Sequence, residues 1–168
     1  RDWSSDVCSS DLLIYLDSAA TSQKPKSVIA AETKFYELIN GAANRGAHLL
    51  AEEASLAYEE ARKRVAKFIN AQSEEVIFTK SATESLNGLA YSLGNPDSKI
   101  NVKSGDEILV SELEHHANLI PWQQLAKRTG AKLRWIEVDE KGNLKLENIE
   151  KLINSKTKVV ALTHQSNV

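Results

Sequence analysis

Three short polar segments contain the residue types that could do chemistry, and each follows an apolar run typical of a strand. They are Ser-Ala-Thr-Glu at 81–84, Glu-His-His-Ala-Asn at 114–118 and Thr-His-Gln-Ser-Asn at 163–167. In open parallel sheets, ligands bind at the carboxyl ends of the strands. The three segments are therefore predicted to converge on one crevice, suited to an aromatic ring that carries a phosphate.

The segment 81–84 has two interpretations. Ala82 and Thr83 are small residues at the start of a predicted helix, where free backbone N–H groups attract an anion such as phosphate. Alternatively, Ser81 and Glu84 form a capping box, which needs no ligand. The residues alone favour the capping box.

The other two segments are less specific when each is taken alone. Adjacent histidines point in different directions on most backbones, so His115 and His116 are not expected to form a metal site. One of the two rings could stack on a planar cofactor, and a solvated loop histidine is the alternative for either. Asn167 could donate a hydrogen bond to a cofactor oxygen.

The elements that position these segments alternate along the chain between short β-branched runs and longer runs of helical period. This alternation predicts an α/β fold with a parallel sheet covered by helices. The expected strands are 13–16, 75–79, 108–110, 133–138 and 158–162. The expected helices are 25–39, 52–70, 82–93, 118–129 and 146–153, and the expected loops are 41–48, 94–105 and 139–143. The chain stops six residues after the last predicted strand, so the sheet is expected to be incomplete.

Composition excludes several classes of function. The chain has 21 basic and 23 acidic residues mixed along 168 positions, which predicts no nucleic-acid partner. It contains neither a run of roughly 20 apolar residues nor a secretory signal pattern, so no membrane partner is expected. A single cysteine, Cys8, excludes a thiolate metal site within one chain, no other metal site is predicted, and a cytoplasmic location fits best.

Residues 1–12 are rich in Ser and Asp and differ in character from the rest of the chain. They are interpreted as a non-native tail, which removes Cys8 from the catalytic candidates.

Five motifs in order carry a resemblance to a known family. They are LDSAAT at 16–21, NRGAH at 44–48, SATESLN at 81–87, EHHANLIPW at 114–122 and THQSNV at 163–168. The series resembles the class V aminotransferases, fold type I of the pyridoxal-phosphate enzymes, and specifically their SufS-like cysteine desulfurases and selenocysteine lyases. The resemblance covers residues 13–168, which it identifies as the N-terminal part of a truncated cofactor-binding domain, and its most specific part is 114–122.

The resemblance implies a set of cofactor contacts. Ala82 and Thr83 would hold the phosphate of pyridoxal 5′-phosphate through backbone N–H groups and a hydroxyl, which reverses the preference for the capping box. His115 would stack on the pyridine ring and lie close to the proton transfers of the reaction, as the catalytic residue. Asn167 would hydrogen-bond the phenolic oxygen of the ring.

The resemblance also implies substrate contacts. Ala19 and Ala20 would line the approach to the substrate carboxylate, and Asn44, Arg45 and His48 would belong to a substrate-entrance loop near a dimer interface. Many relatives have His where this chain has Asn44, which weakens the assignment of that contact. Many also have two threonines where this chain has Ala82 and Thr83, a change that keeps one hydroxyl and a backbone donor.

The implied activity is conversion of L-cysteine to L-alanine and an enzyme persulfide, whose sulfur passes to an acceptor protein for iron-sulfur cluster assembly. The parent enzyme would be a homodimer. Its cofactor-binding lysine and nucleophilic cysteine would fall beyond Val168, so this fragment is expected to be inactive, and Lys80 is not assigned the lysine's role. The alternatives are a selenocysteine lyase, another class V lyase or transaminase, and a non-catalytic α/β module that binds an anion.

Overall fold

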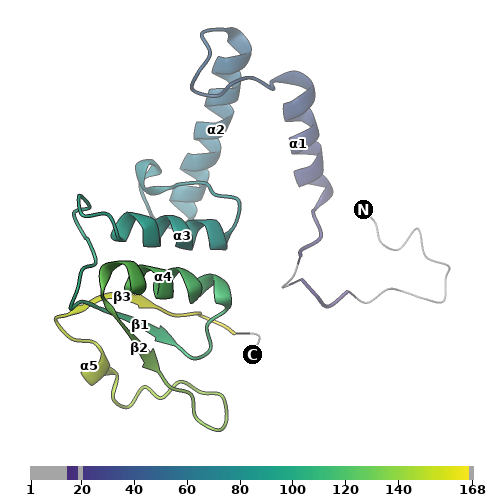
Figure 1. The fold of residues 1–168 in the computed structure, drawn as a ribbon. Helices are drawn as coiled ribbons and strands as arrows, with labels where there is room; N and C mark the ends of the chain where they lie inside the picture. Colours follow the sequence, from purple (N-terminus) through teal and green to yellow (C-terminus); the bar gives the residue numbers. More distant parts are fainter. Residues whose placement is uncertain (1–14, 19–20, 167–168) are drawn as a thin grey trace, which may run out of the picture. The chain divides into compact units, whose positions relative to one another are not determined.

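The computed structural model describes residues 15–18 and 21–166, and the chain divides into two compact units, residues 1–77 and 78–168 (Figure 1). The predicted tail at 1–12 lies outside the described residues, as do Ala19, Ala20 and Asn167.

The first unit is helical among its described residues. It contains α1 (Lys26–Leu38), α2 (Leu49–Phe68) and the 3₁₀ turn η1 (Ser73–Glu75). Pro25 immediately precedes α1, a place where its missing N–H costs nothing. α2 begins three residues before its predicted start because His48 caps it, with Nδ1 accepting a hydrogen bond from the backbone N–H of Ala51.

The predicted strand at 75–79 is wrong. Glu75 belongs to η1, and the residues after it form no ladder with any described strand. Ile77 is 82% exposed. A β-branched run becomes a strand only when a neighbouring strand accepts its backbone hydrogen bonds, and the described part of the chain supplies none here. Of the predicted strand at 13–16, Tyr15 and Leu16 are described and are not in a strand.

The second unit confirms the predicted α/β class. Its strands are β1 (Glu107–Ser111), β2 (Lys132–Ile136) and β3 (Thr157–Ala161), which form a parallel sheet in the order β2-β1-β3. The register pairs Ile108 of β1 with Leu133 of β2 and with Val159 of β3. All five residues of the central strand β1 are buried, as expected for a strand covered on both faces.

The helices of this unit are α3 (Ala82–Leu93), α4 (Ile120–Thr129) and the short α5 (Ile149–Leu152), with a 3₁₀ turn η2 (His116–Asn118) before α4. α3 and α4 pack side by side on the sheet, and α5 lies beside β2 (Figure 1). The core between α3, α4 and the sheet is formed by Ala90, Val102, Ile108, Val110, Trp122, Leu125 and Ala161. The predicted helix at 146–153 is shortened to α5, which buries none of its residues.

The predicted end of the helix at 118–129 and the predicted loop at 139–143 are confirmed. Gly130 ends α4 in the left-handed conformation, with φ of 76° and its N–H donating to the carbonyl of Ala126. In the turn at 139–143, Oδ1 of Asp139 accepts backbone hydrogen bonds from Lys141 and Asn143, both at 2.8 Å. The hydrogen bond from Asn143 is the main cause that holds the pKa of Asp139 below its ordinary value.

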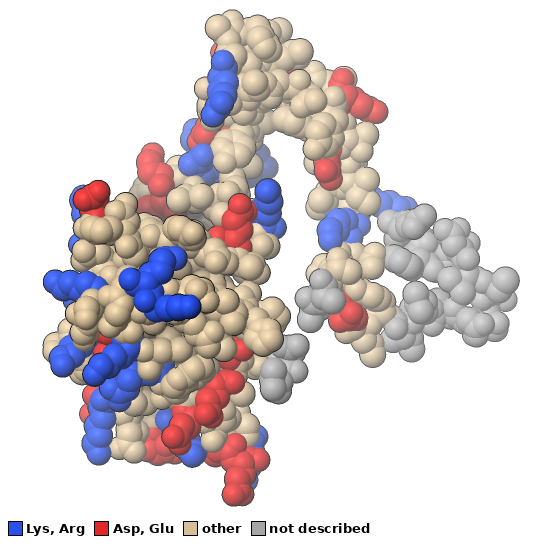
Figure 2. Space-filling model, viewed as in Figure 1, with Lys and Arg blue, Asp and Glu red and all other residues tan. Residues whose placement is uncertain are grey.

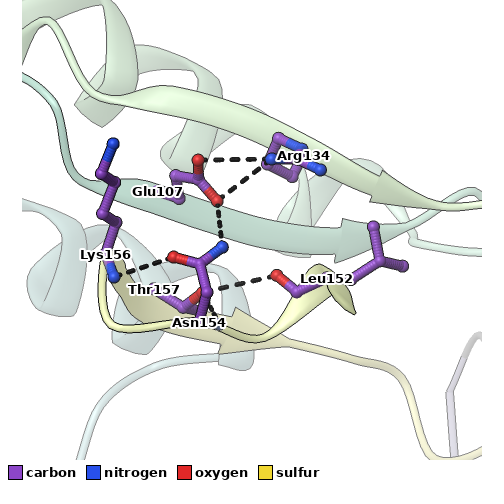
Figure 3. Close-up of polar contacts among 6 residues, drawn as sticks. All are labelled: Glu107, Arg134, Leu152, Asn154, Lys156 and Thr157. Carbon is purple, nitrogen blue, oxygen red and sulfur yellow. Dashed lines mark hydrogen bonds and ion pairs between the residues drawn. The ribbon is translucent and has the colours of Figure 1, made fainter. Parts of the chain in front are cut away.

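A polar cluster joins all three strands at the amino end of β1. The carboxylate of Glu107, 7% exposed, accepts hydrogen bonds from Nη1 of Arg134 at 3.2 and 3.3 Å and from Nδ2 of Asn154 at 3.0 Å (Figure 3). The Asn154 hydrogen bond, aided by the charge of Arg134 and opposed by burial, holds the pKa of Glu107 below its ordinary value. The cluster ties β1 to β2 and to the turn before β3.

On the face of the second unit drawn in Figure 2, Lys and Arg side chains lie among Asp and Glu side chains. Among the described helices, none combines the length and the apolar composition that crossing a bilayer requires.

Candidate functional site

A cleft of about 700 Å³ opens in the second unit, where α3 begins and β1 and β3 end. Ala82 at the start of α3, His115 after β1 and Thr163 after β3 all line it. The structure therefore brings together one residue from each of the three polar segments that the sequence predicts to converge. The rest of the lining is largely apolar, with Leu86 and Val160 among its residues.

The start of α3 shows the Ser81 cap but not the full capping box, because the Glu84 side chain bonds the residue before the cap, and it leaves room for an anion. Oγ of Ser81 accepts the N–H of Glu84 at 3.3 Å, and the Glu84 carboxylate accepts the N–H of Lys80 at 2.6 Å. Ala82 and Thr83 are the first two residues of the helix, so their N–H groups have no partner within it. Because the cap occupies the third N–H group only, it does not compete with an anion at the first two.

His115 lies between this cleft and a second hollow of about 320 Å³, to which Thr83, Asn87 and His116 contribute. Its Nδ1 accepts the N–H of Ala117 at 3.0 Å and so caps η2. In the neutral ring this acceptor role leaves the proton on Nε2. The imidazole is thus held by one nitrogen while the other is available to a ligand.

Glu114 is a functional candidate that the sequence reasoning missed. It is 8% exposed, and its carboxylate accepts from Oγ of Ser111 at 2.6 Å, the N–H of Thr163 at 2.8 Å and Nδ2 of Asn118 at 2.6 Å. Oδ1 of Asn118 in turn accepts Nε1–H of Trp122 at 3.0 Å. The spacing of four between Glu114, Asn118 and Trp122 is the signal that could have revealed this chain of hydrogen bonds.

The segment after β3 is attached to the segment after β1 at a second point. Oγ of Ser166 donates to the carbonyl of Leu113 at 3.1 Å. Asn167, the predicted contact to the phenolic oxygen, is the next residue and lies outside the described part of the chain.

The assignments of the predicted substrate residues stay predictions. Asn44 and Arg45 belong to the first unit, where Asn44 adopts a positive φ of 60° and its N–H donates to Oγ of Ser55 at 2.7 Å. Arg45 is exposed. Ala19 and Ala20, the predicted lining of the carboxylate approach, are outside the described residues.

The donors around the cleft suit a phosphate ester on a flat ring. Two helix-start N–H groups fit a phosphate, because backbone N–H groups at a helix start favour anions, and Thr83, which lines the neighbouring hollow, adds a hydroxyl. The His115 ring and the apolar wall that includes Leu86 fit the faces of an aromatic ring.

Comparisons with known proteins agree with this chemistry. A family model described as aminotransferase class-V matches residues 14–168. The chain belongs to this family. A probable cysteine desulfurase of Streptomyces coelicolor is 54% identical over 157 residues, which are 93% of this chain and 38% of that protein. A cysteine desulfurase of Haloferax volcanii is 47% identical over 92% of this chain and 36% of its own length.

Solved structures of cysteine desulfurases extend the agreement to the fold. An apo cysteine desulfurase from Thermococcus onnurineus has a TM-score of 0.83 and 45% identity, over 92% of this chain and 37% of that one. A cysteine desulfurase from Escherichia coli has a TM-score of 0.74 and 37% identity, over 92% of this chain and 38% of that one. The chain thus spans less than two-fifths of the length of these relatives.

Proposed function

We propose that this chain is part of a cysteine desulfurase and contributes the phosphate-binding and ring-stacking side of its pyridoxal 5′-phosphate site. The observation that carries the proposal is the cleft at which the start of α3 meets His115. Identities of 54% and 47% to cysteine desulfurases support the activity, and the fit of the donors supports the cofactor.

The first two residues of α3 would hold the phosphate. The N–H groups of Ala82 and Thr83 and the Thr83 hydroxyl supply three donors, and the positive end of the helix dipole adds to the attraction. Ala82 contributes no bulk beyond a methyl group, so a phosphate oxygen can approach the backbone. The bound cofactor supplies an electron sink when the α-proton of an amino acid substrate leaves.

His115 would lie against the ring of the cofactor and take part in proton transfer through Nε2, because Nδ1 is held by Ala117. Asn167 would donate to the phenolic oxygen of the ring. Ala19, Ala20, Asn44 and Arg45 would face the substrate, and Asn44 is the position where this chain departs from many relatives.

We further propose L-cysteine as the substrate, with L-alanine and an enzyme persulfide as products. The sulfur would pass to an acceptor protein that serves iron-sulfur cluster assembly, in a cytoplasmic homodimer. The resemblance to SufS-like enzymes supports these finer assignments.

The test begins with the DNA that encodes the chain. Its in-frame translation on both sides of the codons for this chain defines the complete gene product, which is then purified and supplied with pyridoxal 5′-phosphate. We expect an absorption band of bound cofactor and formation of L-alanine from L-cysteine. Cofactor binding without any alanine would refute L-cysteine as the substrate and leave the alternatives of another class V activity or a non-catalytic module, which other amino acid substrates would separate. Absence of cofactor binding would refute the proposal.

A variant pair locates the phosphate. Thr83→Ala removes a hydroxyl that would donate to a charged acceptor, so the Kd for pyridoxal 5′-phosphate is expected to rise by about tenfold. Thr33→Ala, which alters an exposed threonine of α1, is the control and should leave this Kd unchanged. Equal Kd values for the two variants would place the phosphate elsewhere.

A further inference from the structure

The segments that follow β1 and β3 carry His115 and lead to Asn167, and the carboxylate of Glu114 joins them. One oxygen of this carboxylate accepts from the Ser111 hydroxyl at the end of β1 and from the N–H of Thr163 after β3. Thr163 is 49 residues away in the chain. This oxygen atom therefore links the two segments beyond the ends of their strands, where the hydrogen bond from Ser166 to Leu113 is a second link.

The other carboxylate oxygen extends the link to a helix. It accepts Nδ2–H of Asn118, whose Oδ1 accepts Nε1–H of Trp122, a core residue of α4 that is 3% exposed. Glu114 is thus held from three directions. Its neighbour His115 projects from the same stretch of backbone, which these contacts restrain.

The burial of the Glu114 carboxylate costs free energy, which points to a role for its hydrogen bonds. Burial of a carboxylate is unfavourable, and within the described residues Glu114 forms no ion pair that would offset its charge. Neutral donors compensate for that cost through short charge-assisted hydrogen bonds. A glutamine of similar size would carry no charge to desolvate, but it could not accept from all of these donors at once.

We propose that Glu114 is a positioning residue, which fixes His115 relative to the segment 163–166 so that groups from both segments meet one ligand. This inference rests on the proposed function, since His115 is assigned its role there. Glu114 lines the cleft, but its carboxylate is occupied by Ser111, Thr163 and Asn118. It acts through the placement of its neighbours, and a displacement of about 1 Å in such groups can cost a factor of roughly a hundred in rate.

Two substitutions in the complete gene product separate geometry from charge. Glu114→Gln keeps the side-chain length, so its carbonyl still accepts from Ser111 and Thr163, and only the bond from Asn118 is lost. Glu114→Asp keeps the charge but withdraws the carboxylate by one methylene. A positioning role predicts that kcat falls by about tenfold in Glu114→Gln and by about a hundredfold in Glu114→Asp, with KM changed less than either.

Glu107 provides a matched control on the same strand. It is buried to a similar degree, 7% against 8% exposed, and it also accepts hydrogen bonds from other elements, but it lies at the amino end of β1 (Figure 3). Glu107→Gln and Glu107→Asp are expected to lower the melting temperature as the Glu114 variants do. They should leave kcat unchanged, because they leave the His115 segment in place.

Amide hydrogen exchange gives a readout that needs no activity. The N–H groups of Thr163 and Ala117 should exchange faster in Glu114→Asp than in the wild type. In Glu107→Asp their exchange rates should be unchanged. This pattern with an inactive wild type would support the positioning role and refute only the proposed function. Equal kcat and equal exchange in the Glu114 and Glu107 pairs, or a higher kcat in Glu114→Asp than in Glu114→Gln, would overturn the inference.

Discussion

His115 combines three roles that two substitutions in the complete gene product can separate. Its Nδ1 caps η2, its ring faces the cleft, and its Nε2 carries the proton of the neutral ring. His115→Asn keeps a capping acceptor in nearly the same place but removes the aromatic ring. His115→Phe keeps a flat ring but removes both the cap and the titratable group.

Each role has its own expected magnitude. Loss of the cap in His115→Phe should lower the free energy of unfolding by about 0.5–1 kcal/mol, the lower part of the range for capping residues, since the bond to Ala117 is exposed. Loss of ring stacking in His115→Asn is worth about 0.5–1.5 kcal/mol, which raises the Kd for pyridoxal 5′-phosphate by roughly two- to tenfold. Both variants lack the proton-transfer group, so kcat should fall by at least about a hundredfold in each.

Three measurements check these values. Urea unfolding reports the cap, a cofactor titration followed by absorbance reports the stacking, and alanine formation from cysteine reports the proton transfer. A kcat within about threefold of the wild type in either variant would refute the acid-base role. An equal Kd in His115→Asn and His115→Phe would refute the stacking.

Three further predictions concern stability. In the complete gene product, Gly130→Ala should lower the free energy of unfolding by about 1–2 kcal/mol, because φ is 76° and the new Cβ would meet Oγ of Ser104 at 3.2 Å. Urea unfolding should show a smaller loss for Gly142→Ala, where φ is 81° and no atom lies within 4 Å of the new Cβ. Equal losses in the two variants would contradict the contribution of the contact with Ser104. Because the pKa of Glu107 in the folded chain lies below 4.5, its contribution to stability is complete above that pH and is lost as the pH falls through the folded pKa. The free energy of unfolding of Glu107→Gln should therefore decline less steeply with falling pH than that of the wild type. The isolated 168-residue chain should elute largely as aggregates from a sizing column, since edge strand β3 exposes apolar side chains such as Val160. Val160→Lys should increase the monomer fraction. A monodisperse wild type with a cooperative melt would refute this reasoning.

The elements that the sequence determined are those with local signals. α3 has its predicted bounds, Ala82 to Leu93, because Ser81 caps one end and Gly94 follows the other. The end of α4 at Gly130 follows from a conformation that glycine adopts without strain. The convergence of the segments after β1 and β3 was also predictable, because parallel strands place their carboxyl ends at one edge. Segment 81–84 reaches the same cleft from the start of α3, without the strand that was predicted before it.

Tertiary structure decided what depends on a distant partner. The apolar run at 75–79 has the composition of a strand, yet no described strand pairs with it, and pairing is a property of two segments. The role of Glu114 was hidden for the same reason. Its sequence neighbours suggest a polar loop, whereas its burial and its bond to Thr163 arise only when β1 and β3 lie side by side.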